Sequence, residues 1–151
     1  MTVPKRFSVA FSRLDDRQAR ELLASQHVGR LAFTLHDRVD IEPISYVLLG
    51  DWLYGRTSEG TKLSVLRHSP WVAFEVDEIR SPYDWRSVVV HGTAYFISSD
   101  DDEALYREAV GLLRAADARV LTEDDPAKER SHVFRIYLNS LTGRAATTGP
   151  R

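Results

Sequence analysis

The segment with the clearest chemical character is Gly55–Lys62, which reads Gly-Arg-Thr-Ser-Glu-Gly-Thr-Lys. It joins a predicted strand to a predicted helix and gathers hydroxyl groups, a glycine and a lysine at that junction. The N-terminus of a helix offers free N–H groups and a partial positive charge, and both stabilise a bound phosphate. Lys62 adds a full positive charge. The segment therefore predicts a binding site for an anionic group.

The same segment has a second interpretation. It nearly matches the nucleotide-binding loop G-x-x-x-x-G-K-[ST], but Thr61 precedes Lys62, so the lysine and the metal-binding hydroxyl are in reversed order. That loop also belongs between a parallel strand and a long helix, whereas the strand here has a hairpin pattern. Ser58 and Thr61 are also typical of residues that cap a surface helix, with Lys62 solvated. The pattern alone slightly favours this second interpretation.

Other catalytic patterns are missing from the sequence. The five histidines show no ligand spacing such as H-E-x-x-H, and there is no cysteine, so neither a metal site nor a thiol nucleophile is predicted. No G-x-S-x-G motif is present, and the acidic pair Asp77–Glu78 is typical of solvated side chains at a strand end. We predict no catalytic side chain. An enzyme of this kind would need a cofactor, and a phosphate-bearing one fits Gly55–Lys62.

The composition is that of a folded protein, and residues 1–151 are expected to form one domain. Its net charge of −2 lacks the basic excess that binding to a phosphate backbone requires, so nucleic acid is not an expected partner. No stretch approaches the ~20 apolar residues of a membrane span. With no cysteine in the chain, a cytoplasmic protein is expected.

Three helices and six strands are expected to position this segment. The helices are predicted at about Asp15–Gln26, at Lys62–Arg67 and at about Asp101–Ala116, and Ser12 with Asp15 has the pattern of a capping box before the first. The predicted strands are Val28–Leu35, Val39–Leu49, Trp52–Thr57, Trp71–Val76, Trp85–Ile97 and Ser131–Leu138.

The connections between the strands are too short for the helical crossovers that parallel strands need, so antiparallel pairing is expected. Six strands with several bends would close into a small barrel with the helices outside, which is an α+β fold. Gly92 predicts a bulge in its strand. The residues from Thr142 onward are small and polar, and they are expected to form a tail.

Several short motifs occur along the chain, and their order is typical of one protein family. They are Val28–Phe33, Pro43–Val47, Leu53–Tyr54 leading to Gly60–Leu63, Phe74–Glu78, and Trp85–Val90 followed by Gly92. Together they resemble the pyridoxamine 5′-phosphate oxidase-like split-barrel family, in the branch that includes nitroimidazole-resistance proteins. The resemblance is close over about residues 12 to 97 and looser in the last strand, which ends at Leu141–Arg144.

The resemblance implies a homodimeric split β-barrel with flavin mononucleotide (FMN) in two equivalent clefts at the subunit interface. It also implies a set of cofactor-binding residues. The isoalloxazine ring would be lined by Ile44, Ser45, Tyr46 and Val47, and the ribityl chain and phosphate would be followed by Arg56, Thr57 and Ser58. The phosphate itself would be held by Thr61 and Lys62. The flavin would also be approached by Trp85 and Ser87, with the partner subunit as one source of these two residues.

Structural roles also explain some of these residues. Tyr46 and Val47 are typical of barrel core, Trp85 of a strand-end aromatic plug, and Ser87 of a solvated edge. Without the resemblance, the pattern favours these roles. Two departures from the family also matter. True pyridoxamine phosphate oxidases hold the phosphate with two adjacent basic residues, and this sequence has Thr61–Lys62 in their place, which leaves one cation. Those oxidases also have a C-terminal extension with a tryptophan, whereas the tail after Leu141 is short and has none. Oxidation of vitamin B6 is therefore not the expected activity.

The function implied by the resemblance is that of an FMN-dependent oxidoreductase. It would take hydride from a nicotinamide donor and pass electrons to a small acceptor such as a nitro compound or a quinone. The single Lys62 leaves room for a deazaflavin in place of FMN. The sequence is also compatible with a non-catalytic carrier or sensor of flavin or haem, and with a structural dimer that holds no cofactor.

Overall fold

The computed structural model describes residues 7–150, and for residues 61–63 and 150 it describes the backbone alone. Seven strands and three helices lie in this part of the chain. In order they are β1 (Phe7–Leu14), α1 (Asp16–Ser25), β2 (Val28–Leu35), β3 (Arg38–Leu49), β4 (Trp52–Thr57), α2 (Thr61–His68), β5 (Trp71–Ser81), β6 (Asp84–Ile97), α3 (Glu103–Ala116) and β7 (His132–Pro150).

Strands β2 to β7 close into a barrel. The sheet has the order β1-β7-β4-β3-β2-β5-β6, and β6 also pairs with β7, which completes a ring of six strands. All the strand pairs are antiparallel. The predicted six-stranded antiparallel barrel with flanking helices is therefore confirmed, and β1 is a seventh strand outside the ring.

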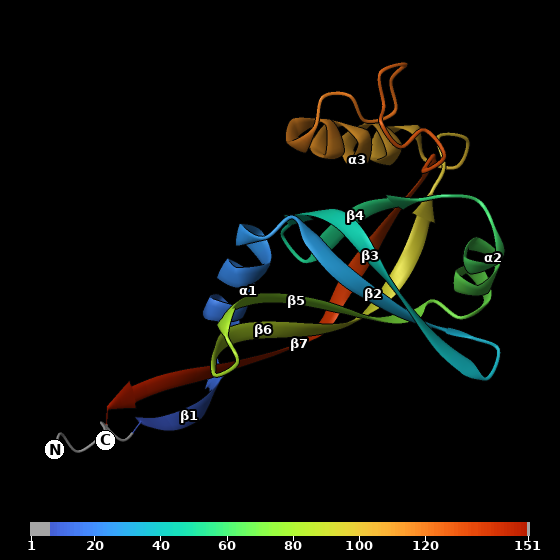
Figure 1. The fold of residues 1–151 in the computed structure, drawn as a ribbon. Helices are drawn as coiled ribbons and strands as arrows, with labels where there is room; N and C mark the ends of the chain where they lie inside the picture. Colours follow the sequence, from blue (N-terminus) through green and yellow to red (C-terminus); the bar gives the residue numbers. More distant parts are fainter. Residues whose placement is uncertain (1–6, 151) are drawn as a thin grey trace, which may run out of the picture.

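Strand β7 is much longer than predicted, and the expected polar tail from Thr142 is wrong. Its first part pairs with β4, while its second part pairs with β1, as in the match of Arg13 with Arg144, and runs past the last pair with β6 at Ala146. Figure 1 shows β1 and the end of β7 as an arm at one end of the molecule. Small side chains suit this ladder, because a Cβ atom at Gly143 would lie 2.6 Å from Leu14 Cβ.

The helix starts also differ in detail from the prediction. The N-cap of α1 is Asp15, whose carboxylate accepts the N–H of Gln18 while Gln18 Oε1 accepts the N–H of Asp15. The capping box therefore uses Asp15 and Gln18, whereas Ser12 lies in β1 opposite Ala145. Helix α3 begins at Glu103, because the Asp102 side chain accepts the N–H of Leu105.

Two apolar clusters form the core, one on each side of the barrel wall. The alternation of a strand separates them, since Leu53 of β4 points into the barrel and its neighbour Tyr54 points outward. The inner cluster includes Phe74 and Leu66, and the outer cluster lies under α3 and includes Val110. Helix α3 is thus fixed against the outer faces of β3, β4 and β7.

The bulge predicted at Gly92 is confirmed by a register shift between His91 and Gly92 where β6 pairs with β7. A Cβ atom at Gly92 would lie 2.5 Å from the carbonyl oxygen of Tyr137, so only glycine fits there without a shift of the backbone. Within residues 7–150, none of the helices has both the length and the apolar composition needed to cross a membrane.

Candidate functional site

Two cavities are candidates for a ligand site. The first, called here the β3 cavity, has a volume of about 330 Å³ and lies between the outer face of β3, the end of α3 and the loop 117–130. Its lining residues are His27, Ser45, Tyr46, Val47, Arg56, Leu113, Ala116, Asp117, Val120, Pro126, Ala127 and Arg130. Four predicted cofactor contacts are therefore brought together here: Ser45, Tyr46, Val47 and Arg56.

The alternation of β3 decides which side chains face this cavity. Ile44 and Tyr46 are buried in the inner cluster, so Ser45 and Val47 point to the outer face. The Tyr46 hydroxyl donates to the carbonyl oxygen of Leu23 at 2.5 Å, its ring packs edge-on against Phe74, and burial raises the pKa of its phenol. Tyr46 thus has the core role that the residue pattern also allowed, Ile44 is a core residue as well, and only the backbone at these two positions is free for a ligand.

Arg56 is held by Asp125 in a buried, two-bonded ion pair. Its Nη1 donates to Asp125 Oδ2 at 2.5 Å and its Nη2 donates to Oδ1 at 2.9 Å, and the two side chains are only 14% and 1% exposed. Nη1 also donates to the carbonyl oxygens of Ala127 and Arg130. Arg56 therefore fastens the loop 117–130 to the barrel wall beside the β3 cavity.

Asp125 organises the loop from its other side. Its carboxylate accepts the N–H of Leu121 and of Ala127, each within 2.9 Å. The hydrogen bond from Arg56 is the main reason that the pKa of Asp125 lies well below its usual range. The prediction that Arg56 contacts a cofactor stays a prediction, and the contact it makes in the structure is with this loop.

The predicted phosphate-binding residues lie at the start of α2. The N-cap of the helix is Gly60, which offers no side chain to the first turn, and the capping role expected for Ser58 and Thr61 stays a prediction. A Cβ atom at Gly60 would have no heavy atom within 4 Å, which leaves the approach open. A helix N-terminus with an open approach suits an anionic group. The side chains of Thr61 and Lys62 lie outside the described residues.

Thr57 and Ser58 differ in their surroundings. Thr57 is 2% exposed and continues the inward row of Leu53 and Gly55, so its hydroxyl faces the barrel interior. Within the described residues, its Oγ1 has no hydrogen-bond partner. Ser58, the next residue, is half-buried and begins the connection to α2. The predicted contact of Thr57 with a cofactor stays a prediction.

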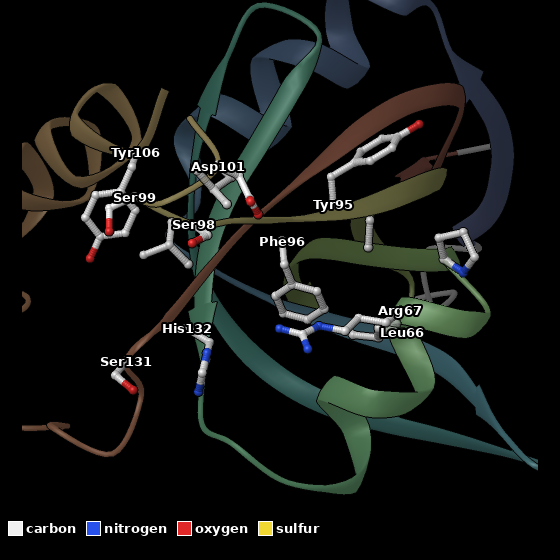
Figure 2. A pocket seen from close by; sticks show the side chains of 14 residues that line it. Leu66, Arg67, Tyr95, Phe96, Ser98, Ser99, Asp101, Tyr106, Ser131 and His132 are labelled. Carbon is white, nitrogen blue, oxygen red and sulfur yellow. The ribbon is translucent and has the colours of Figure 1, made fainter. Parts of the chain in front are cut away.

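The second cavity, called here the α2–α3 cavity, has a volume of about 760 Å³ and lies between these two helices (Figure 2). Leu66, Arg67 and Pro70 line it from the α2 side, Ala94 to Ser99, Asp101 and Tyr106 from the β6–α3 side, and Ser131, His132 and Val133 from the start of β7. The guanidinium carbon of Arg67 lies 5.8 Å from the centre of the Phe96 ring. Sequence reasoning missed this cavity because its residues come from three distant segments.

Trp85 and Ser87 lie near the start of β6, beside the β1 arm. The Trp85 ring is 6.4 Å from that of Phe11, and Ser87 pairs with Arg144. Neither residue lines the β3 cavity or the α2–α3 cavity. Within one chain the structure therefore does not bring these two residues to the outer face of β3.

Among the described residues that line the β3 cavity, Asp117 carries the carboxylate. Asp117, at its rim, accepts a hydrogen bond from Arg119 Nη2 at 2.8 Å, and this bond lowers the pKa of Asp117 to about 2. An ionised, paired carboxylate is a poor proton donor at neutral pH. Among the residues that the structure describes, no three or more His, Asp or Glu side chains are grouped in a way that could hold a metal ion.

Comparison with known proteins gives the same fold and a family. The sequence pattern of the pyridoxamine 5′-phosphate oxidase family matches residues 15–145. An uncharacterized protein of Rhizobium meliloti is 34% identical over 148 residues, which cover 92% of this chain and 98% of the relative. The fold and these matches define an antiparallel split barrel.

Two solved structures share this barrel. A FAD-binding protein of Mesorhizobium loti has a TM-score of 0.74 and 25% identity, over 91% of this chain and 99% of its own. A FAD-binding protein of Mycobacterium smegmatis has a TM-score of 0.64 and 27% identity, over 90% of this chain and 99% of its own. The chain belongs to the pyridoxamine 5′-phosphate oxidase family, as the ordered motifs predicted.

Proposed function

We propose that this chain is one subunit of a flavin-dependent oxidoreductase. The observation that carries the proposal is that Ser45, Val47 and Arg56 line one cavity, and that the chain leads from Arg56 at the end of β4 to the N-terminus of α2. A flavin nucleotide has the same order of parts: a flat ring, a polar chain and a phosphate. The similar structures from M. loti and M. smegmatis, both described as FAD-binding proteins, support the same cofactor class.

The predicted residues have distinct roles in this proposal. The backbone of Ile44 to Val47 and the Ser45 side chain hold the ring, and Arg56, Thr57 and Ser58 lie along the chain that leads to the phosphate. Thr61 and Lys62, at the start of α2, hold the phosphate itself. The loop 117–130, fastened by Asp125, excludes water from the outer side of the ring.

When bound, a flavin would supply hydride and electron transfer between a nicotinamide donor and a small acceptor, such as a nitro compound or a quinone. The chain contributes position and shielding, because the acidic group at the rim, Asp117, is already paired with Arg119. The β3 cavity alone, at about 330 Å³, is near the lower end of ligand pockets, which span about 300–1,000 Å³. A second subunit would complete the site.

The proposed homodimer accounts for Trp85 and Ser87. Exposed apolar side chains lie close to these residues, namely Phe7 (66%) and Phe11 (70%) on the β1 arm and Ile79 (66%) on β5, which pairs with Trp85. Such patches are typical of protein interfaces. In a two-fold dimer the same arm from each chain would bring Trp85 and Ser87 to the partner's β3. A cytoplasmic location belongs to the same proposal.

The direct test is the spectrum of the purified protein, followed by anaerobic addition of reduced nicotinamide. We expect flavin absorption that bleaches, and loss of flavin in Thr61→Ala and Lys62→Ala. Lys128→Ala is the matched control, because Lys128 is exposed in the loop 117–130. The absorption of a deazaflavin, or a haem Soret band, would show that the protein binds that cofactor and not the proposed flavin. A bound flavin that no nicotinamide reduces would favour a carrier or sensor.

A further inference from the structure

We propose that His27 donates a proton to the electron acceptor in the β3 cavity. This inference rests on the proposed function and deepens it, because it assigns a chemical role to one side chain of the same site. His27 lies between α1 and β2 and lines the cavity. Its carbonyl oxygen accepts the N–H of Tyr46 at 3.0 Å, and the next residue, Val28, pairs with Ser45. His27 is therefore fixed beside the part of β3 that holds the flavin ring in the proposed function.

A two-electron acceptor such as a quinone needs a proton in addition to a hydride. The hydride carries two electrons and one proton, and it leaves the acceptor with a negative charge. A second proton on the acceptor oxygen completes the hydroquinone. The nicotinamide donor supplies the hydride by way of the flavin, so the second proton must come from a side chain or from water.

The other polar side chains that line the cavity are poor proton donors at neutral pH. The carboxyl group of Asp117, whose pKa is lowered to about 2, has already lost its proton. Arg56 and Arg130 are guanidinium groups, which keep their protons in proteins. The hydroxyl of Tyr46 is bonded to a backbone carbonyl oxygen and its pKa is raised by burial, and Ser45 carries an aliphatic hydroxyl. Among the described residues of the lining, the imidazole is the group left for this role.

Histidine has the chemistry that the step requires. The imidazole side chain gains and loses its charge between about pH 5 and pH 8, so it can act as a general acid near neutrality. When the acceptor oxygen gains the proton, an N–H bond of the imidazolium breaks and the ring becomes neutral. His27 is exposed, so water can return the proton before the next turnover. The step thus balances without a further reactant.

The test compares an acceptor that needs this proton with one that does not. The flavin-loaded protein is reduced with one equivalent of dithionite and mixed anaerobically with benzoquinone, or with ferricyanide, which takes one electron and no proton. In His27→Gln we expect reduction of the quinone to be at least about tenfold slower and reduction of ferricyanide to be unchanged. The parental rate with the quinone should fall as the pH rises from about 6 to about 8, and the variant should lose this dependence. The matched control is His91→Gln, an exposed histidine of β6 that does not line the cavity.

A second measurement needs no turnover. The imidazole signals of the apo-protein, labelled with ¹⁵N-histidine, are recorded by NMR before and after FMN is added, and the spectra of His27→Gln and His91→Gln identify the two signals. We expect FMN to shift the signal of His27 and to leave that of His91 in place. The affinity of His27→Gln for FMN should equal that of the parent, because the proton is needed only by the acceptor.

The outcomes separate this inference from the proposed function. A His27→Gln variant that slows quinone and ferricyanide alike, or slows neither, would overturn the inference, as would a His27 signal that FMN does not shift. A flavin that no nicotinamide reduces would remove the proposed electron donor and leave this test intact, because dithionite reduces the flavin. A protein that binds no flavin would remove the proposed function and this inference with it.

Discussion

Arg56 and Asp125 form a buried ion pair between residues 69 positions apart in the sequence, and this pair joins strand β4 to the loop that precedes β7. Both carboxylate oxygens of Asp125 accept from the guanidinium, and both also accept from backbone N–H groups of the loop. The loop therefore depends on one carboxylate for its attachment to the barrel.

Replacement of Asp125 should release this loop. In Asp125→Ala, Arg56 is left without its partner in a largely buried place, so we expect the Tm to fall by roughly 5 °C or more. Faster cleavage of the loop 117–130 in limited proteolysis should accompany the change. Asp124→Ala is the control, because that neighbour is exposed. Equal proteolysis of the two variants would show that the ion pair does not hold the loop.

The Arg56–Asp125 ion pair also predicts how the stability of the protein changes at acidic pH. Because the pKa of Asp125 is lowered in the folded state, its contribution to stability is present above the ordinary aspartate value of 3.8 and is lost as the pH falls through the lowered pKa. Urea unfolding between pH 5 and pH 3 should therefore show a smaller loss of stability in Asp125→Ala than in the parent.

Glu75 should make the protein less stable as the pH rises toward neutrality. Burial first, and then the hydrogen bond and charge of Asp77, raise the pKa of Glu75 to about 7, while Arg30 lowers it in part. A raised pKa means that the stability is full below the ordinary value of 4.5 and is lost as the pH rises through about 7. The free energy of unfolding should decline over that interval.

Glu75→Gln isolates this effect, because the amide does not titrate. Its free energy of unfolding, measured in urea at pH 5 and pH 7.5, should change less between the two values than that of the parent. Glu123→Gln, in the exposed part of the loop 117–130, should keep the parental difference. The same pH difference in Glu75→Gln as in the parent would contradict the prediction.

Two glycines should respond to alanine in opposite directions. At Gly92 the new Cβ atom would lie 2.5 Å from the carbonyl oxygen of Tyr137, so we expect a loss of about 1–3 kcal/mol. At Gly111, inside α3, a Cβ atom would have nothing within 4 Å, so the higher helix propensity of alanine should stabilise the protein by roughly 0.5–1 kcal/mol. Chemical denaturation of both variants measures the two signs.

The proposed dimer should depend on the β1 arm. Phe11 is 70% exposed and lies beside Trp85, so Phe11→Asp places a charge in the surface that a second copy would cover. We expect the parent to be a dimer in light scattering, and the variant to be a monomer that has lost its flavin. Val39→Asp, 77% exposed and on the β2–β3 hairpin away from the arm in Figure 1, should remain a dimer. A parent that binds flavin as a monomer would refute the arrangement.

The barrel could be predicted from the sequence because its strands carry local signals. The alternation of Leu31 and Phe33 with polar or small neighbours marks β2, and the grouping of Ser45 to Val47 follows from one strand. Strand β1 carries the same signal in Phe7, Val9 and Phe11 and was missed, whereas the end of β7 has no such alternation. Residues such as Thr147 and Thr148 are strand residues only because β1 pairs with them.

The candidate site, like the barrel, could be predicted only where its residues are close together in the sequence. The residues that share a strand or a turn were found together, whereas Asp125 and Arg130 were missed because a charged loop gives no sign of its partner on β4. Trp85 and Ser87 were expected beside the flavin through the family resemblance. Their position at the start of β6, beside the arm, makes that expectation depend on a second chain.

The double pairing of β7 has a consequence for the order of assembly. Its first part supplies neighbours to both β4 and β6, so the ring stays open until this strand has left the ribosome. Strand pairs between residues far apart in the sequence, such as Ser8 with Gly149, predict slow folding. Until closure, β4 and β6 expose hydrogen-bonding edges that invite aggregation. Truncated chains that end before residue 132, and so lack β7, should therefore need a chaperone or precipitate.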